Sequence, residues 1–260
     1  MIAVGSRTRR LVAKGAALSA ALAADVLAMQ AVAAFRREYL AADSAPSIEG
    51  DYGDPSDPTV RLVVLGDSTG AGVGVTDTDD SVGGRLASLL TESHLHVQLS
   101  GVAVFGSRAG DLGPQVSRAL LNRPDIAIVL VGANDATHAT PPRRIRPALI
   151  GAIRRLRAAG VPVVLGTCPD LGGVRSVARP LRDLLAAYGR RVAAAQAEAG
   201  TRAGALVVDI AASTGEAFRA NPAETLAADG FHPSAGGYEL WAQALLPAVR
   251  DAVSIRLPQT

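Results

Sequence analysis

The turn around Ser68 places a serine hydroxyl where nucleophilic chemistry is feasible. Residues 66–70 have the sequence GDSTG and directly follow an apolar run at residues 60–65. A serine hydroxyl is a weak nucleophile. It needs a base to take its proton and hydrogen-bond donors to hold the oxyanion that forms when it attacks a carbonyl. A base and suitable donors are therefore expected after later apolar runs.

Two other interpretations of this glycine-rich turn, residues 66–74, fit the sequence less well. The turn lacks the Gly-Lys-Ser/Thr end of a phosphate-binding Walker A loop, and Val75 stands where a dinucleotide-binding loop has its third glycine. The GDSTG sequence also matches the G-x-S-x-G elbow of α/β-hydrolases, but that elbow follows several strands. Here only a tail and a linker precede it, which favours a nucleophilic serine at the end of a first strand.

His232 is the candidate base. It lies in the sequence DGFHP, three residues after Asp229 and just before the last helical segment. A carboxylate at this spacing can hold the imidazole through Nδ1 and leave Nε2 free to accept the serine proton. The alternative is a helix-entry loop in which both residues only cap the helix.

The other three histidines have plainer interpretations. His94 and His96 flank an apolar run two residues apart, so a metal pair is conceivable, but no third ligand is evident and surface or edge-strand positions are favoured. His138 follows another apolar run and is expected to rim a pocket, without a chemical role.

Three groups are candidates for an oxyanion hole. Asn134 comes directly after the apolar run 126–131, where its side-chain amide can donate into the same crevice as Ser68. Gly106 offers a backbone N–H that an oxyanion can approach closely, because no side chain intervenes. Ser68 can add its own backbone N–H. Taken singly, Asn134 and Gly106 are typical turn residues.

Apolar runs and helical segments alternate along the chain from Thr59 onward. The predicted strands cover residues 60–65, 96–99, 126–131, 161–165 and 205–208. The predicted helices cover residues 82–93, 112–121, 142–159, 177–199 and 235 to about 253. Continuous Val/Ile/Leu strands separated by helices indicate a parallel sheet covered on both faces. Ligands of such sheets bind beyond the carboxyl ends of the strands, where the candidate residues lie.

The combination of these motifs resembles the SGNH, or GDSL, hydrolase superfamily. Gly-Asp-Ser, a glycine about forty residues later, Gly-x-Asn-Asp and a late Asp-x-x-His occur in the order and spacing of that family. The resemblance implies a flavodoxin-like three-layer α/β/α sandwich with a five-stranded parallel sheet. It also implies Ser68 as nucleophile, His232 as base, Asp229 as its orienting acid, and Ser68, Gly106 and Asn134 as the oxyanion hole.

The resemblance covers the chain from Thr59 to the last helix. It does not decide which glycine supplies the oxyanion-hole N–H, because Gly101 or Gly110 could replace Gly106. The resemblance implies hydrolysis of carboxylic esters through an acyl-serine. No segment between the predicted strands is long enough to form a large lid, which favours substrates with short to medium acyl chains. Alternatives are an acyltransferase or deacetylase acting on envelope carbohydrate or lipid, and a catalytically silent envelope-binding domain. Small actinobacterial esterases with an N-terminal apolar segment are similar.

The N-terminal 42 residues differ from the rest and predict an apolar helix that serves as a signal anchor or signal peptide. Residues 15–34 carry one charge, Asp25, which would cost about 2.5 to 3.5 kcal/mol near the centre of a bilayer. A cationic start and an Ala-Val-Ala pattern at residues 31–33 are typical of exported proteins. We expect localisation at the cell envelope; the alternative is a soluble alanine-rich helix in the cytoplasm.

The charge distribution separates this tail from the body. Residues 1–42 hold six basic and two acidic side chains, a sum of +4, so the remainder carries −2 of the net +2. The body thus lacks the basic excess of nucleic-acid-binding proteins. Residues 43–58 contain five acids, three prolines and no base, which predicts a solvated linker. The hydrolase domain is expected at residues 59–260.

Cysteine and metal chemistry have little support in the sequence. Cys168 is the single cysteine, so no intrachain disulfide and no cysteine-based zinc site can form, and a small buried hydrophobic role is favoured. No metal or organic cofactor is expected, and the expected partner is a small-molecule ester.

Overall fold

Helices and strands alternate through most of the computed structural model, which describes residues 5–257. The strands are β1 (Glu49–Tyr52), β2 (Thr59–Gly66), β3 (His96–Gly101), β4 (Ile126–Leu130), β5 (Val163–Gly166) and β6 (Leu206–Val208). The helices are α1 (Gly5–Arg36), α2 (Val82–Thr91), α3 (Leu112–Leu121), α4 (Ala133–Thr137), α5 (Pro142–Ala158), α6 (Leu181–Ala203), α7 (Ile210–Ala220), α8 (Pro222–Thr225) and α9 (Ala235–Arg256). Short 3-10 turns occur at Ala42–Ser44, Thr78–Asp80 and Ala109–Asp111.

The strands form one mixed sheet in the order β1-β3-β2-β4-β5-β6. Strands β2 to β6 are parallel and match the five predicted apolar runs within two residues at each end, whereas β1 runs antiparallel to β3. The central strand β4 is buried along its whole length, as expected for a strand covered on both faces. The predicted α/β sandwich with a parallel five-stranded core is confirmed.

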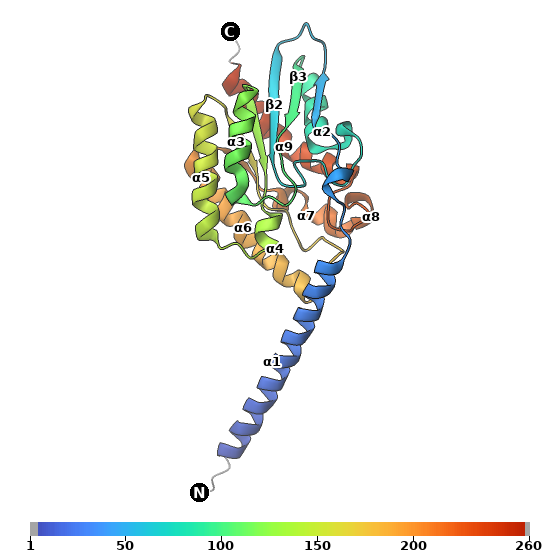
Figure 1. The fold of residues 1–260 in the computed structure, drawn as a ribbon, viewed down its shortest axis with the longest axis vertical. Helices are drawn as coiled ribbons and strands as arrows, with labels where there is room; N and C mark the ends of the chain where they lie inside the picture. Colours follow the sequence, from blue (N-terminus) through green and yellow to red (C-terminus); the bar gives the residue numbers. More distant parts are fainter. Residues whose placement is uncertain (1–4, 258–260) are drawn as a thin grey trace.

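Alternate residues of β2 point into two separate cores, which makes the domain a three-layer sandwich (Figure 1). Val63 and Leu65 pack with apolar side chains of α3, α5 and α6. Leu62 and Val64 pack instead with α2, α7 and α9. Because successive side chains of a strand point to opposite faces, a run of apolar residues is needed to fill both cores.

The prediction that residues 43–58 form only a solvated linker is wrong for Glu49–Tyr52, which is strand β1. This strand shows alternating exposed and half-buried residues and pairs with β3 through its backbone. This acidic strand lies at the sheet edge and contains no apolar run, so the sequence pattern does not predict it. Charged side chains at a sheet edge discourage pairing with another chain. The sheet therefore begins ten residues before the expected domain start at Thr59.

The helix predictions are correct in position and differ at their ends. The helix predicted at residues 177–199 begins at Leu181, directly after Pro180, and runs to a left-handed Gly204. The short helices α4, α7 and α8 were not predicted, because one to three turns carry too little apolar periodicity.

The predicted N-terminal helix is present as α1, and it projects from the end of the body near the start of α6 (Figure 1). The Gln30 side chain joins the two, since its Nε2 donates to Arg179 O at 2.6 Å and its Oε1 accepts from Leu181 N at 3.0 Å. Across residues 5–257, no helix has the length and hydropathy required of a transmembrane span.

Candidate active site

Ser68 lies in a turn that requires glycine at its start. Gly66 ends β2 with φ +138°, and a Cβ atom there would lie 1.7 Å from the carbonyl oxygen of Leu130 on the neighbouring strand. That carbonyl accepts the Asp67 N–H at 2.9 Å, so the turn is joined to the end of β4. The turn leaves Ser68 only 5% exposed at the carboxyl edge of the sheet.

Ser68, His232 and Asp229 form one hydrogen-bonded chain. His232 Nε2 lies 2.9 Å from Ser68 Oγ, and His232 Nδ1 lies 2.6 Å from Asp229 Oδ2. All three residues are buried. With Nδ1 facing a carboxylate, Nε2 can accept the proton of the serine hydroxyl, which is the arrangement needed to activate a serine.

Hydrogen bonds keep the Asp229 carboxylate ionised despite its burial. Burial alone would raise its pKa, but the imidazole of His232 and the backbone N–H groups of Phe231 and His232 outweigh that effect and lower the pKa to about 2. The two N–H groups donate to Oδ1 at 2.9 and 3.0 Å. The carboxylate is thus charged at neutral pH and can stabilise an imidazolium.

Close packing between their loops brings Ser68 and His232 together across 164 positions of sequence. A Cβ atom on Gly74, at the end of the Ser68 turn, would lie 2.0 Å from the carbonyl oxygen of Pro233. The buried Tyr238 hydroxyl of α9 donates to Val73 O at 2.6 Å. Since only glycine tolerates the first contact, residues 66–74 and the start of α9 are held at a fixed separation.

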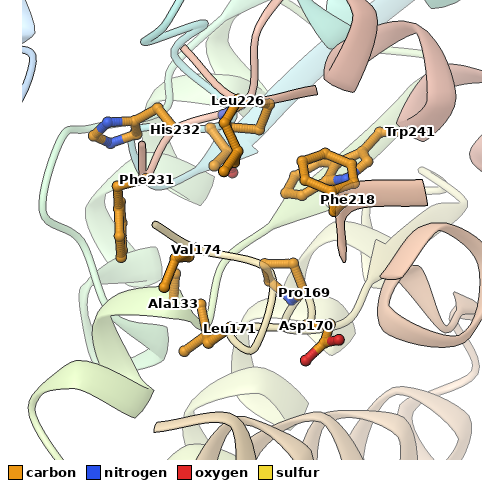
Figure 2. A pocket seen from close by; sticks show the side chains of 12 residues that line it. Ala133, Pro169, Asp170, Leu171, Val174, Phe218, Leu226, Phe231, His232 and Trp241 are labelled. Atoms are coloured by element: carbon orange, nitrogen blue, oxygen red, sulfur yellow. The ribbon is translucent and has the colours of Figure 1, made fainter. Parts of the chain in front are cut away.

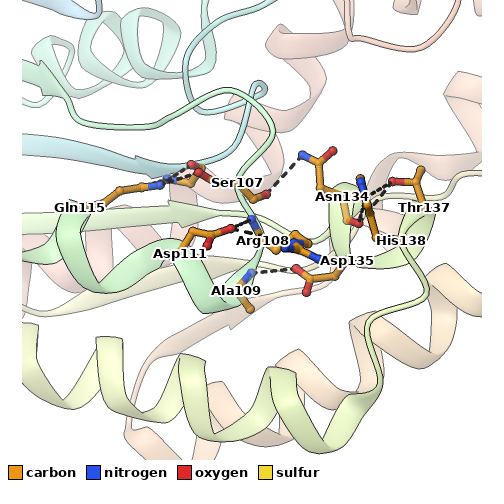
Figure 3. Close-up of polar contacts among 10 residues, drawn as sticks. Ser107, Arg108, Ala109, Asp111, Gln115, Asn134, Asp135, Thr137 and His138 are labelled. Atoms are coloured by element: carbon orange, nitrogen blue, oxygen red, sulfur yellow. Dashed lines mark hydrogen bonds and ion pairs between the residues drawn. The ribbon is translucent and has the colours of Figure 1, made fainter. Parts of the chain in front are cut away.

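The three predicted oxyanion donors lie at the same edge of the sheet. Asn134 lies in α4 just after β4, and its Nδ2 donates to Ser107 O at 3.2 Å (Figure 3). One N–H of the amide therefore fixes the side chain while the other remains available. Gly106 has φ +77° and is exposed, and the ring of its neighbour Phe105 lies 6.2 Å from the His232 imidazole.

The backbone N–H groups of Ser68 and Gly106 donate to no other group within residues 5–257. Of the alternative glycines, Gly101 ends β3 against Ile48, and Gly110 lies in the 3-10 turn Ala109–Asp111. The position next to Phe105 therefore supports Gly106 as the second donor.

Two buried glutamines, which the sequence did not single out, brace the loops that carry these groups. Gln115 of α3 bonds both the N–H and the carbonyl of Gly66, at 2.8 and 2.9 Å, and donates to Ser107 Oγ at 3.0 Å. Gln196 of α6 accepts from Cys168 N and donates to Val131 O, both at 2.6 Å. The sequence signal that could have identified both glutamines is a long polar residue on the apolar face of a predicted helix.

Two further buried acids support this edge of the sheet. Burial raises the pKa of Asp67, although bonds from the Thr69 hydroxyl and N–H to its Oδ1 act in the opposite direction. Burial also raises the pKa of Asp135, whose Oδ2 accepts the Ala109 N–H at 2.8 Å (Figure 3). Both carboxyl groups hold turns in place.

The remaining histidines lie away from the triad. His94 is exposed with φ +53° and precedes β3, so it does not share a face with His96, which is buried and contacts Asp51 of β1 at 3.4 Å. His138 lines a polar cavity of about 280 Å³ with Arg108 and Arg144, as predicted for a pocket rim. Within residues 5–257, no group of three or more potential metal ligands occurs. Cys168 is buried, and burial raises the pKa of its thiol.

A small, largely apolar cavity of about 30 Å³ adjoins the triad (Figure 2). His232 and Thr69 form its catalytic side, and its apolar walls include Leu171, Val174 and Trp241. Its small volume limits what can lie beside His232 and Thr69.

Comparison with known proteins identifies the family of this chain. Residues 64–240 match the model of the GDSL-like lipase/acylhydrolase family. A GDSL-like esterase of Mycobacterium tuberculosis is 34% identical over 228 residues, which cover 83% of this chain and 73% of that protein.

Solved structures show the same fold. The acetylxylan esterase Axe2 of Geobacillus stearothermophilus has a TM-score of 0.55 at 20% identity, covering 76% of this chain and 95% of that one. A lipase/acylhydrolase of Enterococcus faecalis has a TM-score of 0.58 at 22% identity, covering 77% and 100%. The chain therefore belongs to the GDSL-like lipase/acylhydrolase family, the SGNH hydrolases, and is an ester hydrolase rather than a silent binding domain.

Proposed function

We propose that this enzyme hydrolyses carboxylic esters of short acyl groups through an acyl-serine intermediate formed on Ser68. His232 Nε2 takes the hydroxyl proton as Ser68 Oγ bonds to the ester carbonyl carbon. The negative charge that develops on the carbonyl oxygen is held by the N–H groups of Ser68 and Gly106 and by the Asn134 amide. The C–O bond to the alcohol then breaks, and His232 donates its proton to the departing alcohol.

Water completes the cycle by the same route. His232 takes a proton from a water molecule, whose oxygen attacks the acyl carbon. The second tetrahedral intermediate releases the carboxylic acid as the proton returns to Ser68 Oγ. Asp229 stays ionised throughout and stabilises the imidazolium, consistent with a pKa of about 2.

The observation that carries this proposal is the hydrogen-bonded chain from Ser68 Oγ through His232 to Asp229, at 2.9 and 2.6 Å. Nucleophile, base and orienting acid lie within hydrogen-bonding distance of one another. Such geometry is the signature of an activated serine.

The preference for short acyl groups rests on the small cavity beside His232. The free volume of this cavity is only about 30 Å³, and its walls include Val174, Phe231 and Trp241. Acetyl or propionyl groups need little adjustment there, whereas a long chain would have to displace Val174 or Trp241. We expect kcat/KM for p-nitrophenyl esters to be highest for acetate to butyrate, and a maximum at palmitate would refute this preference.

The decisive experiment compares Ser68→Ala with Ser88→Ala, an exposed serine of α2. Ser68→Ala should abolish p-nitrophenyl acetate hydrolysis and labelling by a fluorophosphonate probe, while Ser88→Ala retains both. Circular dichroism and the melting temperature Tm check that both variants fold. Full activity in a folded Ser68→Ala protein would sink the proposal.

We also propose that the chain is delivered to the cell envelope through its N-terminal segment. The support is the apolar stretch 15–34 with cationic flanks, which forms part of a helix projecting from the catalytic body (Figure 1). Fractionation of cells with N-terminal sequencing of the recovered protein tests it. Recovery of the intact chain in the cytosolic fraction alone would contradict it.

A further inference from the structure

Residues 37–48, here called the exit segment, lead from α1 to β1 and run past the triad. The sequence assigned this stretch to a tail and a linker outside the catalytic domain. In the structure the Leu40 N–H donates to Asp229 Oδ2 at 3.3 Å. The Tyr39 ring packs edge-on against Phe231, with ring centroids 5.5 Å apart.

The Leu40 donor occupies a specific place on the carboxylate. Oδ2 is the oxygen that also bonds His232 Nδ1, while Oδ1 accepts the two N–H groups of its own loop, those of Phe231 and His232. Within residues 5–257, Leu40 is thus the only hydrogen-bond donor to Asp229 from outside residues 229–232. It restrains rotation of the carboxylate from the side that faces the imidazole.

Tyr39 supports the imidazole through one intermediate ring. Phe231 packs edge-on against His232 with ring centroids 5.3 Å apart, and Tyr39 covers Phe231 in turn. Edge-to-face packing of this kind is directional, so it restrains the plane of the ring that it contacts.

Both ends of the exit segment are anchored to the body. Before it, Gln30 bonds the backbone at Arg179 and Leu181. At its far end Ile48 is buried against Gly72, which lies in the Ser68 turn, and the Thr78 hydroxyl donates to Ser47 O at 2.7 Å. A segment held at both ends can keep Tyr39 and Leu40 at fixed positions.

We propose that Leu40, through its backbone N–H, and Tyr39, through its ring, are positioning residues for the Asp229–His232 pair, so that these two groups of the exit segment hold the pair in place. This inference rests on the proposed function of the triad. Neither residue touches the reacting atoms, so their loss should lower kcat and leave KM nearly unchanged.

The backbone donor is tested with Leu40→Pro in the full chain, because proline has no N–H. Leu40→Ala keeps the donor, and Ala41→Pro places the same ring constraint where the N–H has no partner within residues 5–257. We expect kcat to fall about tenfold in Leu40→Pro, with KM within about twofold of the parent. Leu40→Ala and Ala41→Pro should keep a kcat close to that of the parent. A loss in either control equal to that in Leu40→Pro would overturn the role of the N–H.

The Tyr39 ring is tested with variants that keep the Leu40 N–H, so this test does not depend on whether Leu40→Pro folds. Tyr39→Ala should lower kcat about 2- to 10-fold without a matching change in KM, and Tyr39→Phe, which retains the ring, should restore it. Equal activity in Tyr39→Ala and the parent would overturn the role of the ring.

Ser68→Ala, assayed beside these variants, separates the two levels of inference. An active Ser68→Ala protein defeats the proposed function itself. An inactive Ser68→Ala protein, together with parental kcat in both Leu40→Pro and Tyr39→Ala, defeats only the role of the exit segment. The Tm of each variant shows whether a loss of kcat reflects unfolding.

Discussion

The side-chain amide of Gln115 bonds both the N–H and the carbonyl of Gly66, the residue from which the Ser68 turn begins. The same amide reaches Ser107, so one side chain of α3 joins the turn of the candidate nucleophile to the loop of the candidate oxyanion donor. Such a bridge sets the separation of two catalytic loops without touching substrate.

Replacing Gln115 by leucine should cost stability and turnover together. The change leaves buried polar groups at Gly66 and Ser107 unpaired, so we expect a loss of about 2 to 3 kcal/mol in the free energy of unfolding, measured by urea denaturation. Turnover should fall as the two loops separate. Gln243→Leu on the exposed surface of α9 is the control and should change stability by less than about 0.5 kcal/mol.

Asn134→Ala tests the oxyanion hole. Loss of one preorganised donor should lower kcat for p-nitrophenyl acetate by about 10²- to 10³-fold with little change in KM, because the donor acts on charge that develops in the transition state. Asn122→Ala, at the exposed end of α3, provides the comparison. A loss of less than threefold in Asn134→Ala would remove the side chain from the proposed hole.

Gly66→Ala should disrupt the Ser68 turn. The new methyl group would lie 1.7 Å from Leu130 O at a φ that other residues rarely adopt, so backbone must move. We expect loss of activity and a clear drop in Tm. Gly151→Ala in α5 is the matched control: its methyl group meets nothing within 4 Å, and removing a helical glycine should stabilise by up to about 1 kcal/mol. Equal Tm values for the two variants would contradict the packing argument.

Asp229 should make the stability of the fold depend on acid pH. Its pKa is about 2 in the folded protein and about 3.9 in an unfolded chain, so the carboxylate stabilises the fold above pH 4, and this contribution is lost as the pH falls toward 2. Between pH 6 and pH 3 the parent should lose about 1 kcal/mol more than Asp229→Asn.

Urea unfolding at the two pH values measures this difference, and Asp251→Asn on the exposed surface of α9 should behave like the parent. Parallel losses in the parent and Asp229→Asn would show that the carboxylate has no depressed pKa.

Apolar periodicity was sufficient for the central architecture. The five parallel strands and the long helices each carry a run or a stripe that has to be buried, and burial of such patterns is what the sheet and its two cores provide. Strand β1 was not predicted, because an edge strand gains its stability from backbone hydrogen bonds, which any sequence can make.

For the site, residue type and order along the chain were enough to single out Ser68, Asn134, Asp229 and His232, because their chemistry is local to short motifs. Gly106 was one of three glycines that fitted its place in the order. The structure brings Ser68, His232 and Asp229 into one hydrogen-bonded chain and sets Asn134 at the same edge. Their catalytic roles stay predictions until the variants are assayed.

The sequence by itself determined the fold class, the family resemblance and the candidate chemistry, since these depend on periodicity and on residues within short motifs. Only the tertiary structure decided what surrounds those residues: the glutamine braces, the narrow cavity, and the contact of Leu40 with Asp229. Each of these joins positions far apart along the chain, often through backbone atoms, and such contacts have no signature in the order of side chains.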